Sequence, residues 1–173
     1  RITGQCHCGN ISFSAIVDPT RVIACHCTDC QTFSGAPFRA VLPVPAEDLS
    51  LYGEPQHYVK VAASGNRRAQ AFCGTCGTNL YATEPDNPTV FSMRLGCINE
   101  RAQLAPSVQI WVGSAMPWLH KLSEVPSYSA GIAPIEQSGG KSEVQHCASA
   151  PQPNRLVKPT PTSCACWYPP HFV

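Results

Sequence analysis

The sequence contains the stretch Gly4-Gln5-Cys6-His7-Cys8-Gly9-Asn10 close to its first residue. Two more cysteine clusters follow along the chain, Cys25-His26-Cys27-Thr28-Asp29-Cys30 and Cys73-Gly74-Thr75-Cys76-Gly77. The Cys-x-Cys spacing of the first two predicts two sulfurs on one face of an extended strand, because side chains alternate across a strand. The third cluster predicts a zinc-knuckle turn, in which glycine lets backbone amides face the sulfurs.

The three clusters hold seven cysteines, which divide naturally into four plus three. A closed structural zinc site has four protein ligands, whereas a catalytic site has three and an open position. The division therefore favours a metalloenzyme over a zinc-finger module. A disulfide framework is the alternative, but the total of 11 cysteines is odd and Cys-x-Cys neighbours bridge poorly. Interleaved His and Gly favour metal thiolates in a reducing compartment, which predicts a cytoplasmic protein.

Length and composition predict one mainly β domain. A chain of 173 residues can bury one real core, and 17 prolines with 12 glycines indicate many turns. The net charge is +1 and no basic run exceeds Arg67-Arg68, which argues against nucleic-acid binding. No apolar stretch approaches the roughly 20 residues of a membrane span. Because the chain opens on Arg1 without an initiator Met, we expect its natural start to lie upstream.

Hydrophobic alternation and turn residues predict a series of strands. The expected strands cover residues 4–17, 21–27, 39–44, 56–63, 67–72, 89–95 and 107–112. We expect a loop to carry Cys30 and the residues up to Phe38, and a single helical turn over 46–49. Pro43 and Pro45 should restrict their strand to a sheet edge or to a strand end.

The last part of the chain has a different composition. From about Pro134 it is rich in proline and has few large aliphatic residues, so it cannot bury enough apolar area to offset its ordering entropy. We therefore expect a domain over residues 1–130 and an irregular or disordered tail over 131–173. The alternative is that Cys164 or Cys166 supplies a further zinc ligand.

Four motifs, in order and at matching spacing, resemble the glutathione-dependent formaldehyde-activating enzymes, a family that includes centromere protein V. The motifs are Gly4-Gln5-Cys6-His7-Cys8-Gly9-Asn10-Ile11-Ser12-Phe13, Cys25-His26-Cys27-Thr28-Asp29-Cys30-Gln31, Ser34-Gly35-Ala36-Pro37-Phe38 and Phe72-Cys73-Gly74-Thr75-Cys76-Gly77-Thr78-Asn79-Leu80. The resemblance covers roughly residues 1–128. It implies a β-tent of stacked antiparallel sheets held by a structural zinc, with a second, catalytic zinc. The tail has no counterpart in the family.

The resemblance also implies which cysteines act together, which spacing alone leaves open. The structural zinc ligands implied by position are Cys6, Cys8, Cys73 and Cys76. The catalytic zinc ligands implied by position are Cys25, Cys27 and Cys30. As an alternative, Cys97 would complete the second set and make both zincs structural.

The activity implied by the resemblance is that of a carbon–sulfur lyase or synthase. It condenses glutathione with formaldehyde to S-(hydroxymethyl)glutathione, or acts on a related thiol adduct. A thiol with a pKa of about 8.5 is mostly protonated at neutral pH, and zinc suits sulfur ligands. The three catalytic-site cysteines would thus activate sulfur through zinc rather than attack covalently. Arg39, Arg67 and Arg68 are candidates to bind the glutathione carboxylates, with solvated strand arginines as the alternative.

Some residues near the motifs have less specific interpretations. We expect His7 and His26 to lie behind the ligands or at the surface rather than to bind zinc. Asp29 could orient a ligand or accept backbone amides in its loop. Three aromatic residues are expected in the core rather than against a substrate, namely Phe38, Trp111 and Trp118.

The chain departs from the family pattern at two positions. Asn99 stands where the family has an acid, and Gln109 stands where it has a His. The loss of two titratable groups leaves the substrate open. Two classes of function therefore remain, a zinc enzyme acting on a thiol and a small aldehyde, and a noncatalytic β-tent interaction module.

Overall fold

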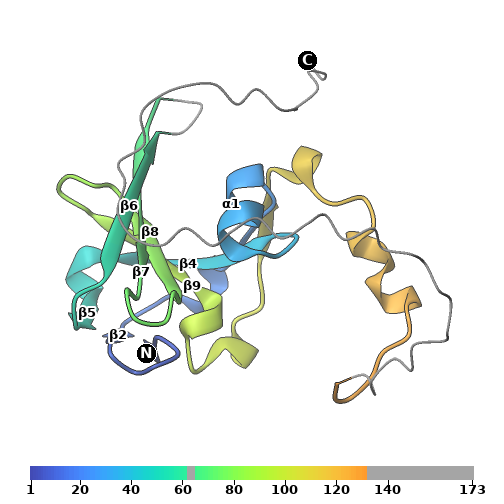
Figure 1. Cartoon of the computed structure of the whole chain (residues 1–173), viewed down its shortest axis with the longest axis horizontal. Coiled ribbons are helices and arrows are strands. Elements are labelled where there is room, and N and C mark those ends of the chain that lie inside the picture. The colour runs from blue at the N-terminus through green and yellow to red at the C-terminus, as the bar shows by residue number, and fades with distance from the viewer. Residues whose placement is uncertain (62–64, 132–173) are drawn as a thin grey trace, which may run out of the picture. The chain divides into compact units, whose positions relative to one another are not determined.

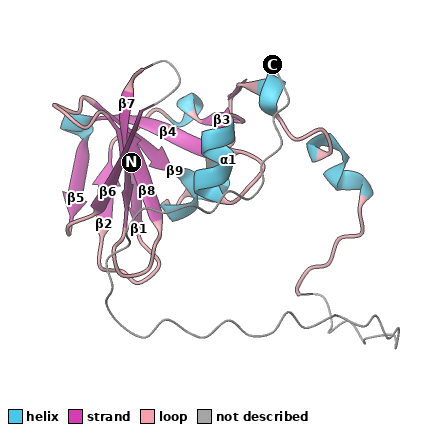
Figure 2. Cartoon of the chain, turned by 45° about the horizontal axis from the view of Figure 1, so that its top comes forward, coloured by secondary structure: helices cyan, strands magenta, loops and turns pink. Residues whose placement is uncertain are grey.

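The computed structural model describes residues 1–61 and 65–131. These residues are mainly β, with two sheets, one α-helix and several short 3-10 turns, as the sequence predicts (Figure 2). Residues Arg1–Ser127 form one compact unit. The division near residue 130 and the role of Cys164 and Cys166 stay predictions, because almost all of the expected tail lies outside the described residues.

The smaller sheet has three antiparallel strands in the order β1-β2-β5. Its strands are β1 (Ile2–Gln5), β2 (Ser12–Ala15) and β5 (Leu49–Tyr52). The predicted single strand over 4–17 is wrong, because the chain reverses between β1 and β2. The amide of Cys6 bonds to the carbonyl of Ile11 at 2.9 Å, and Gly9 takes a φ of 80° in the turn.

The larger sheet has seven strands in the order β10-β3-β4-β9-β8-β7-β6. They are β3 (Ile23–Cys25), β4 (Arg39–Pro45), β6 (Gln56–Val61), β7 (Arg67–Phe72), β8 (Asn79–Thr83), β9 (Val90–Arg94) and β10 (Val108–Ile110). Six of these strands follow one another in antiparallel pairs. The edge strand β10 pairs parallel to β3, so the expectation of purely antiparallel sheets is wrong at that edge.

Strand β4 is central in the larger sheet although it contains two prolines. Its first residues pair with β3 only as far as Val41, and its second half pairs with β9 alone. Pro43 and Pro45 therefore lie where one side of the strand has no partner, and their missing amides cost no ladder hydrogen bond. An edge position is therefore not correct for β4 as a whole. Both prolines nevertheless lie in the half of β4 that has a partner strand on one side only.

The described α-helix is α1 (Thr28–Ser34), in a segment that the sequence predicts as a loop. Cys27 caps its first turn by accepting the amide of Cys30 on its sulfur, and Gly35 ends the helix with a φ of 61°. In both ribbon views α1 lies beside β4 and away from β5 (Figure 1). The 3-10 turns are η1 (Pro19–Arg21), η2 (Ala46–Asp48), η3 (Leu95–Cys97), η4 (Arg101–Gln103), η5 (Val112–Ser114) and η6 (Leu119–Glu124). Of these, η2 confirms the predicted helical turn.

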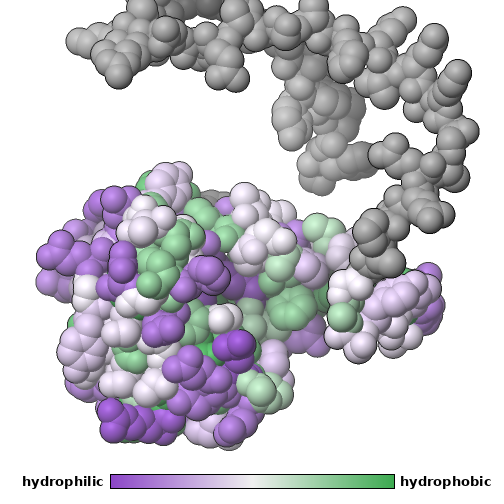
Figure 3. Space-filling model, turned by 60° about the horizontal axis from the view of Figure 1, so that its bottom comes forward, coloured by the Kyte–Doolittle hydropathy of each residue, from purple (hydrophilic) through white to green (hydrophobic). Residues whose placement is uncertain are grey.

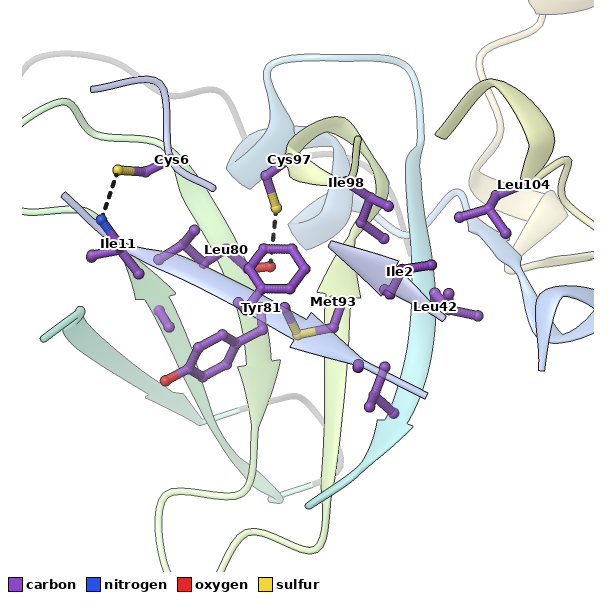
Figure 4. Close-up of a cluster of buried hydrophobic side chains, with 14 of the residues drawn as sticks. Ile2, Cys6, Ile11, Leu42, Leu80, Tyr81, Met93, Cys97, Ile98 and Leu104 are labelled. Atoms are coloured by element: carbon purple, nitrogen blue, oxygen red, sulfur yellow. Dashed lines mark hydrogen bonds between the residues drawn. The ribbon is translucent and has the colours of Figure 1, made fainter. Parts of the chain in front are cut away.

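The hydrophobic core joins the two sheets (Figure 4). Its fully buried side chains include Leu42 and Met93 from the larger sheet, together with Ile98 from the segment after η3. The strands approach so closely that a Cβ atom added to Gly4 would lie 2.2 Å from the ring of Phe13. Close packing of the sheets fixes the register that places the functional side chains.

The surface of the described residues carries both polar and apolar side chains. Figure 3 shows them intermixed on one face, without a continuous apolar surface. No helix among the described residues has the length and apolar character of a membrane span.

Candidate metal centre

Four cysteines from distant parts of the chain meet at the turn between β1 and β2. The Sγ atoms of Cys6, Cys8, Cys73 and Cys76 all lie within 4.8 Å of one another. Sulfur separations include 3.5 Å between Cys6 and Cys8 and 3.7 Å between Cys8 and Cys73. The group therefore joins the turn after β1 to the turn after β7, 65 residues further along the chain.

Backbone amides stabilise both turns, by a bond to sulfur in the first and by a bond to a carbonyl in the second. In the first, the amide of Ile11 donates to the Sγ of Cys6 at 3.3 Å. In the second, Gly77 takes a φ of 72° and donates its amide to the carbonyl of Cys73 at 2.8 Å. The second turn has the tight, glycine-containing form that the sequence predicts, whereas Cys6 and Cys8 lie in a turn and not on a strand face.

Thr78 supports the second turn by contacting Cys76. Its hydroxyl lies 3.2 Å from the Cys76 sulfur. Hydrogen bonds from this hydroxyl and from the Thr78 backbone amide lower the pKa of Cys76 to about 5. A lowered pKa favours the thiolate, which is the form that binds a metal.

The second group consists of Cys25, Cys27 and Cys30, whose Sγ atoms also lie within 4.8 Å of one another. Cys25 ends β3, Cys27 is the cap of α1 and Cys30 lies in its first turn. The predicted strand over 21–27 is thus too long, and the turn into α1 brings these sulfurs together. Burial raises the pKa of Cys30 to about 12.

Within residues 1–61 and 65–131, no fourth metal-binding side chain joins the second group. Cys97, the alternative fourth ligand, lies instead in the core. Its thiol donates to the carbonyl of Arg94 at 3.1 Å, and burial raises its pKa to about 11. Cys97 is therefore a protonated core residue and does not complete the set.

The three cysteines open onto a cavity of about 520 Å³. One face of the larger sheet forms its floor, while the opposite face, with Leu42 and Met93, is buried in the core. The strand register determines which side chains form this floor. Cys25 pairs with Arg39, and Val41 pairs with Arg94. Residues two apart on a strand share a face, so both pairs face the cavity.

Several cationic side chains line the cavity. Arg94 is 5% exposed and donates to Gln70 Oε1 at 2.8 Å, and Arg39 donates to the same oxygen at 3.2 Å. Burial, and then the nearby charge of Arg39, lowers the pKa of Arg94 to about 9. The sequence did not single out Arg94 or Gln70, since burial of a strand arginine depends on its neighbours in the sheet.

The other predicted arginines differ in their positions. Arg68 lines the cavity and forms an ion pair with Glu84. Arg67 is not among the lining residues and pairs with Asp86 at the surface, at 2.9 Å. The interpretation of Arg67 as a substrate ligand is therefore wrong, and the solvated alternative applies to it.

His26 lies behind the second cysteine group and is 1% exposed. Its Nε2 lies 2.9 Å from Gln109 Oε1, and its backbone amide donates to the carbonyl of Ile110. Gln31 donates to the carbonyls of His26 at 2.6 Å and of Ser114 at 2.8 Å. These bonds attach the ligand loop to β10 and η5, so His26 has the predicted supporting position.

The remaining candidates take other positions. His7 is exposed and its amide donates to the Thr78 hydroxyl. Asp29 forms an ion pair with Lys60 across the cavity. The core prediction is wrong for Trp111, which is 65% exposed at the cavity and has a φ of 59°, and for Trp118. The family departures Asn99 and Gln109 are not among the cavity-lining residues.

The two cysteine groups fit zinc by their donor sets. Cysteine sulfur is a preferred zinc ligand, and four sulfurs in mutual reach suit a closed structural ion. Three sulfurs at the edge of a cavity suit an ion that keeps one position for a small molecule. The arrangement could therefore hold two metal ions with different tasks.

The chain is similar to a family of known proteins and to individual members of known sequence or structure. A sequence profile of the glutathione-dependent formaldehyde-activating enzyme family matches residues 1–114. A Schizosaccharomyces pombe protein named an uncharacterized lyase is 32% identical over 78 residues, which is 45% of this chain and 54% of that protein. The chain thus spans about half the length of this relative. A Rhodobacter sphaeroides crystal structure is similar with a TM-score of 0.48 and 17% identity, over 62% of this chain and 98% of that one.

Proposed function

The chain belongs to the glutathione-dependent formaldehyde-activating enzyme family, and on this premise we propose that it is a zinc-dependent carbon–sulfur lyase. Its substrates are glutathione or another small thiol, and formaldehyde or a related small aldehyde. The sulfur–carbon bond forms between the thiol and the aldehyde carbon, and the thiol proton ends on the aldehyde oxygen. The reverse reaction releases the two substrates again. The fold class that accompanies this proposal is the β-tent of the family.

One observation carries the proposal, namely that three cysteines, with no fourth protein ligand among the described residues, lie at a cavity. In this proposal Cys25, Cys27 and Cys30 hold a catalytic zinc, while Cys6, Cys8, Cys73 and Cys76 hold a structural one. When bound at the three cysteines, zinc supplies a soft Lewis acid that stabilises a substrate sulfur as thiolate at neutral pH. A binding module would need neither the incomplete ligand set nor the cavity.

The residues of the chain would hold and orient this centre. His26, Gln109 and Gln31 fix the loop between β3 and α1, so the three sulfurs keep their mutual positions. The guanidinium of Arg39 lies on the strand paired with Cys25 and adds positive charge beside the thiolates. The apolar side chains of Ile23, Val41 and Ile110 line the cavity and limit the water around the reacting groups.

The proposal is tested by exchange spectroscopy on an equilibrium mixture of formaldehyde and glutathione. The protein with its metal should interconvert the free and condensed thiol faster than the uncatalysed mixture. Cys30→Ser should remove this excess rate, whereas Cys97→Ser, which changes a cysteine outside both groups, should keep it. No binding of glutathione at millimolar concentration would contradict the enzyme proposal and favour the noncatalytic module.

The cellular setting follows from the same chemistry. The eight cysteines among the described residues are free, and exposed thiols such as Cys8 persist best in a reducing compartment. A cytoplasmic location is therefore part of this proposal. Glutathione and a small aldehyde are the expected partners, and neither nucleic acid nor a membrane is.

A further inference from the structure

We infer that Arg39, Gln70 and Arg94 form an anion subsite on the cavity floor, which takes a carboxylate of the small molecule bound at the three cysteines. This inference rests on the proposed thiol-binding function and narrows its substrate class to thiols that carry a carboxylate. The evidence comes from burial, hydrogen bonds and charge balance on one face of the larger sheet.

Arg94 is a buried cation for which the described residues provide no carboxylate. It is 5% exposed, and the ion pairs of the described chain include neither Arg94 nor Arg39. Both guanidiniums share one neutral acceptor, Gln70 Oε1, and both keep an Nε atom that is buried without a partner. Burial of a charge without a counter-ion is costly, so such a pair indicates a site for an anion.

The other two cations of the cavity differ from this pair. Lys60 is paired with Asp29, and Arg68 is paired with Glu84. Their charges are therefore already compensated, and the free positive charge lies at Arg39 and Arg94. A guanidinium matches a carboxylate by two parallel hydrogen bonds, which makes a carboxylate the best-fitting anion.

The thiolates of the second cysteine group are the alternative counter-ions. Three thiolates on a divalent ion carry one net negative charge, which is fewer than the two guanidinium charges. A bound thiol that loses its proton would add one more negative charge. The two negative charges at the metal would then equal the two guanidinium charges, and no positive charge would be left over. If the thiolates are the counter-ions, a carboxylate on the ligand should not strengthen its binding. If the arginines form a carboxylate subsite, it should.

The register places the subsite beside the metal centre. Arg39 lies opposite Cys25 in the pairing of β3 with β4, and Arg94 lies opposite Val41 in the pairing of β4 with β9. Gln70 faces the same cavity from β7. A short acid such as 3-mercaptopropionate has its carboxylate two carbons from its sulfur, which suits neighbouring positions on one sheet.

The test compares 3-mercaptopropionate with its uncharged isostere 3-mercaptopropionamide, titrated calorimetrically into the metal-loaded full chain. We expect the acid to bind about tenfold more tightly or better, as for a hydrogen bond to a charged group. In Arg94→Met and in Arg39→Gln the ratio should fall toward one. Arg67→Gln, which removes a paired surface arginine outside the cavity, should leave the ratio unchanged. Thermal unfolding and metal content show that each variant is folded.

Two results would overturn the inference. The wild-type protein could bind acid and amide equally, or Arg94→Met could weaken both ligands by the same factor, which would assign the arginines to the thiolates. Propionate, which lacks a thiol, separates the inference from the proposed function. We expect it to shift the Nε–Hε resonances of Arg39 and Arg94 in nitrogen-15 spectra, even if neither thiol binds and the proposed function is wrong. No shift with propionate together with no acid preference rejects the subsite.

Discussion

The substitutions Cys8→Ser and Cys27→Ser should separate the structural metal site from the proposed catalytic one. Both residues have access to solvent, so a serine at either position does not itself disrupt the core. Each variant should lose one of two zinc ions per chain. They should differ strongly in stability, because the two sites cross-link very different lengths of chain.

The difference can be estimated from loop lengths. Cys8 and Cys73 are 65 residues apart, and a cross-link of this span is worth about 4 kcal/mol in the chain-entropy relation. Cys25 to Cys30 closes only one short turn, for which the same relation gives about 2 kcal/mol. The larger value is a substantial part of a total stability of about 5–15 kcal/mol. We therefore expect Cys8→Ser to lower the urea midpoint by about 2 M, and Cys27→Ser by about half as much.

The assay combines metal analysis by mass spectrometry with urea unfolding followed by circular dichroism. Cys97→Ser is the matched control, since its thiol bonds to a backbone carbonyl and lies in neither metal group. It should retain two zinc ions. Equal destabilisation by Cys8→Ser and Cys27→Ser, or two ions in either variant, would refute the division into four and three ligands.

Three further predictions concern the fold. Gly4→Ala should destabilise the protein by about 1–3 kcal/mol in urea unfolding, because its Cβ would overlap the ring of Phe13. Glu100 accepts bonds from Thr3 that lower its pKa, so its stabilisation should be present at neutral pH and vanish as the pH falls through that lowered value; thermal unfolding of Glu100→Gln should match the wild type only in acid. A chain ending at residue 131 should keep two zinc ions and its unfolding temperature, and loss of an ion on truncation would assign a ligand to residues 132–173.

Most strands could be predicted because their patterns are local. The predicted strand over 67–72 has the bounds of β7, and the one over 39–44 extends by a single residue in β4. The helix α1 was missed for a physical reason, since Cys27 caps it and cysteine is not among the usual capping residues. The break between β1 and β2 was missed because the Cys-x-Cys spacing was interpreted as two sulfurs on one strand face. Cys6 and Cys8 lie instead in the turn between the two strands.

The candidate site shows the same limit at the level of single residues. Cysteine spacing predicted three clusters of possible metal ligands, but the assignment of the first and third clusters to one site came from the family resemblance, because spacing does not show which turns meet in space. Arg39 was a candidate from its chemistry alone. Arg94 and Gln70 could not be found in the same way, since an arginine in an alternating strand is ordinarily exposed. Their burial results from the order of β4, β9, β8 and β7 in one sheet.

This dependence on sheet order links the metal centre to the cations near it. Cys25 and Arg39 face the cavity because β3 and β4 pair in one register, and a shift of β4 by one residue would turn Arg39 toward the core. The same shift would expose Leu42, which is fully buried. The hydrophobic packing of β4 therefore also holds the guanidinium beside the thiols. The departure at Gln109 is compatible with this arrangement, because its side chain holds His26 behind the ligand loop and leaves the cavity floor unchanged.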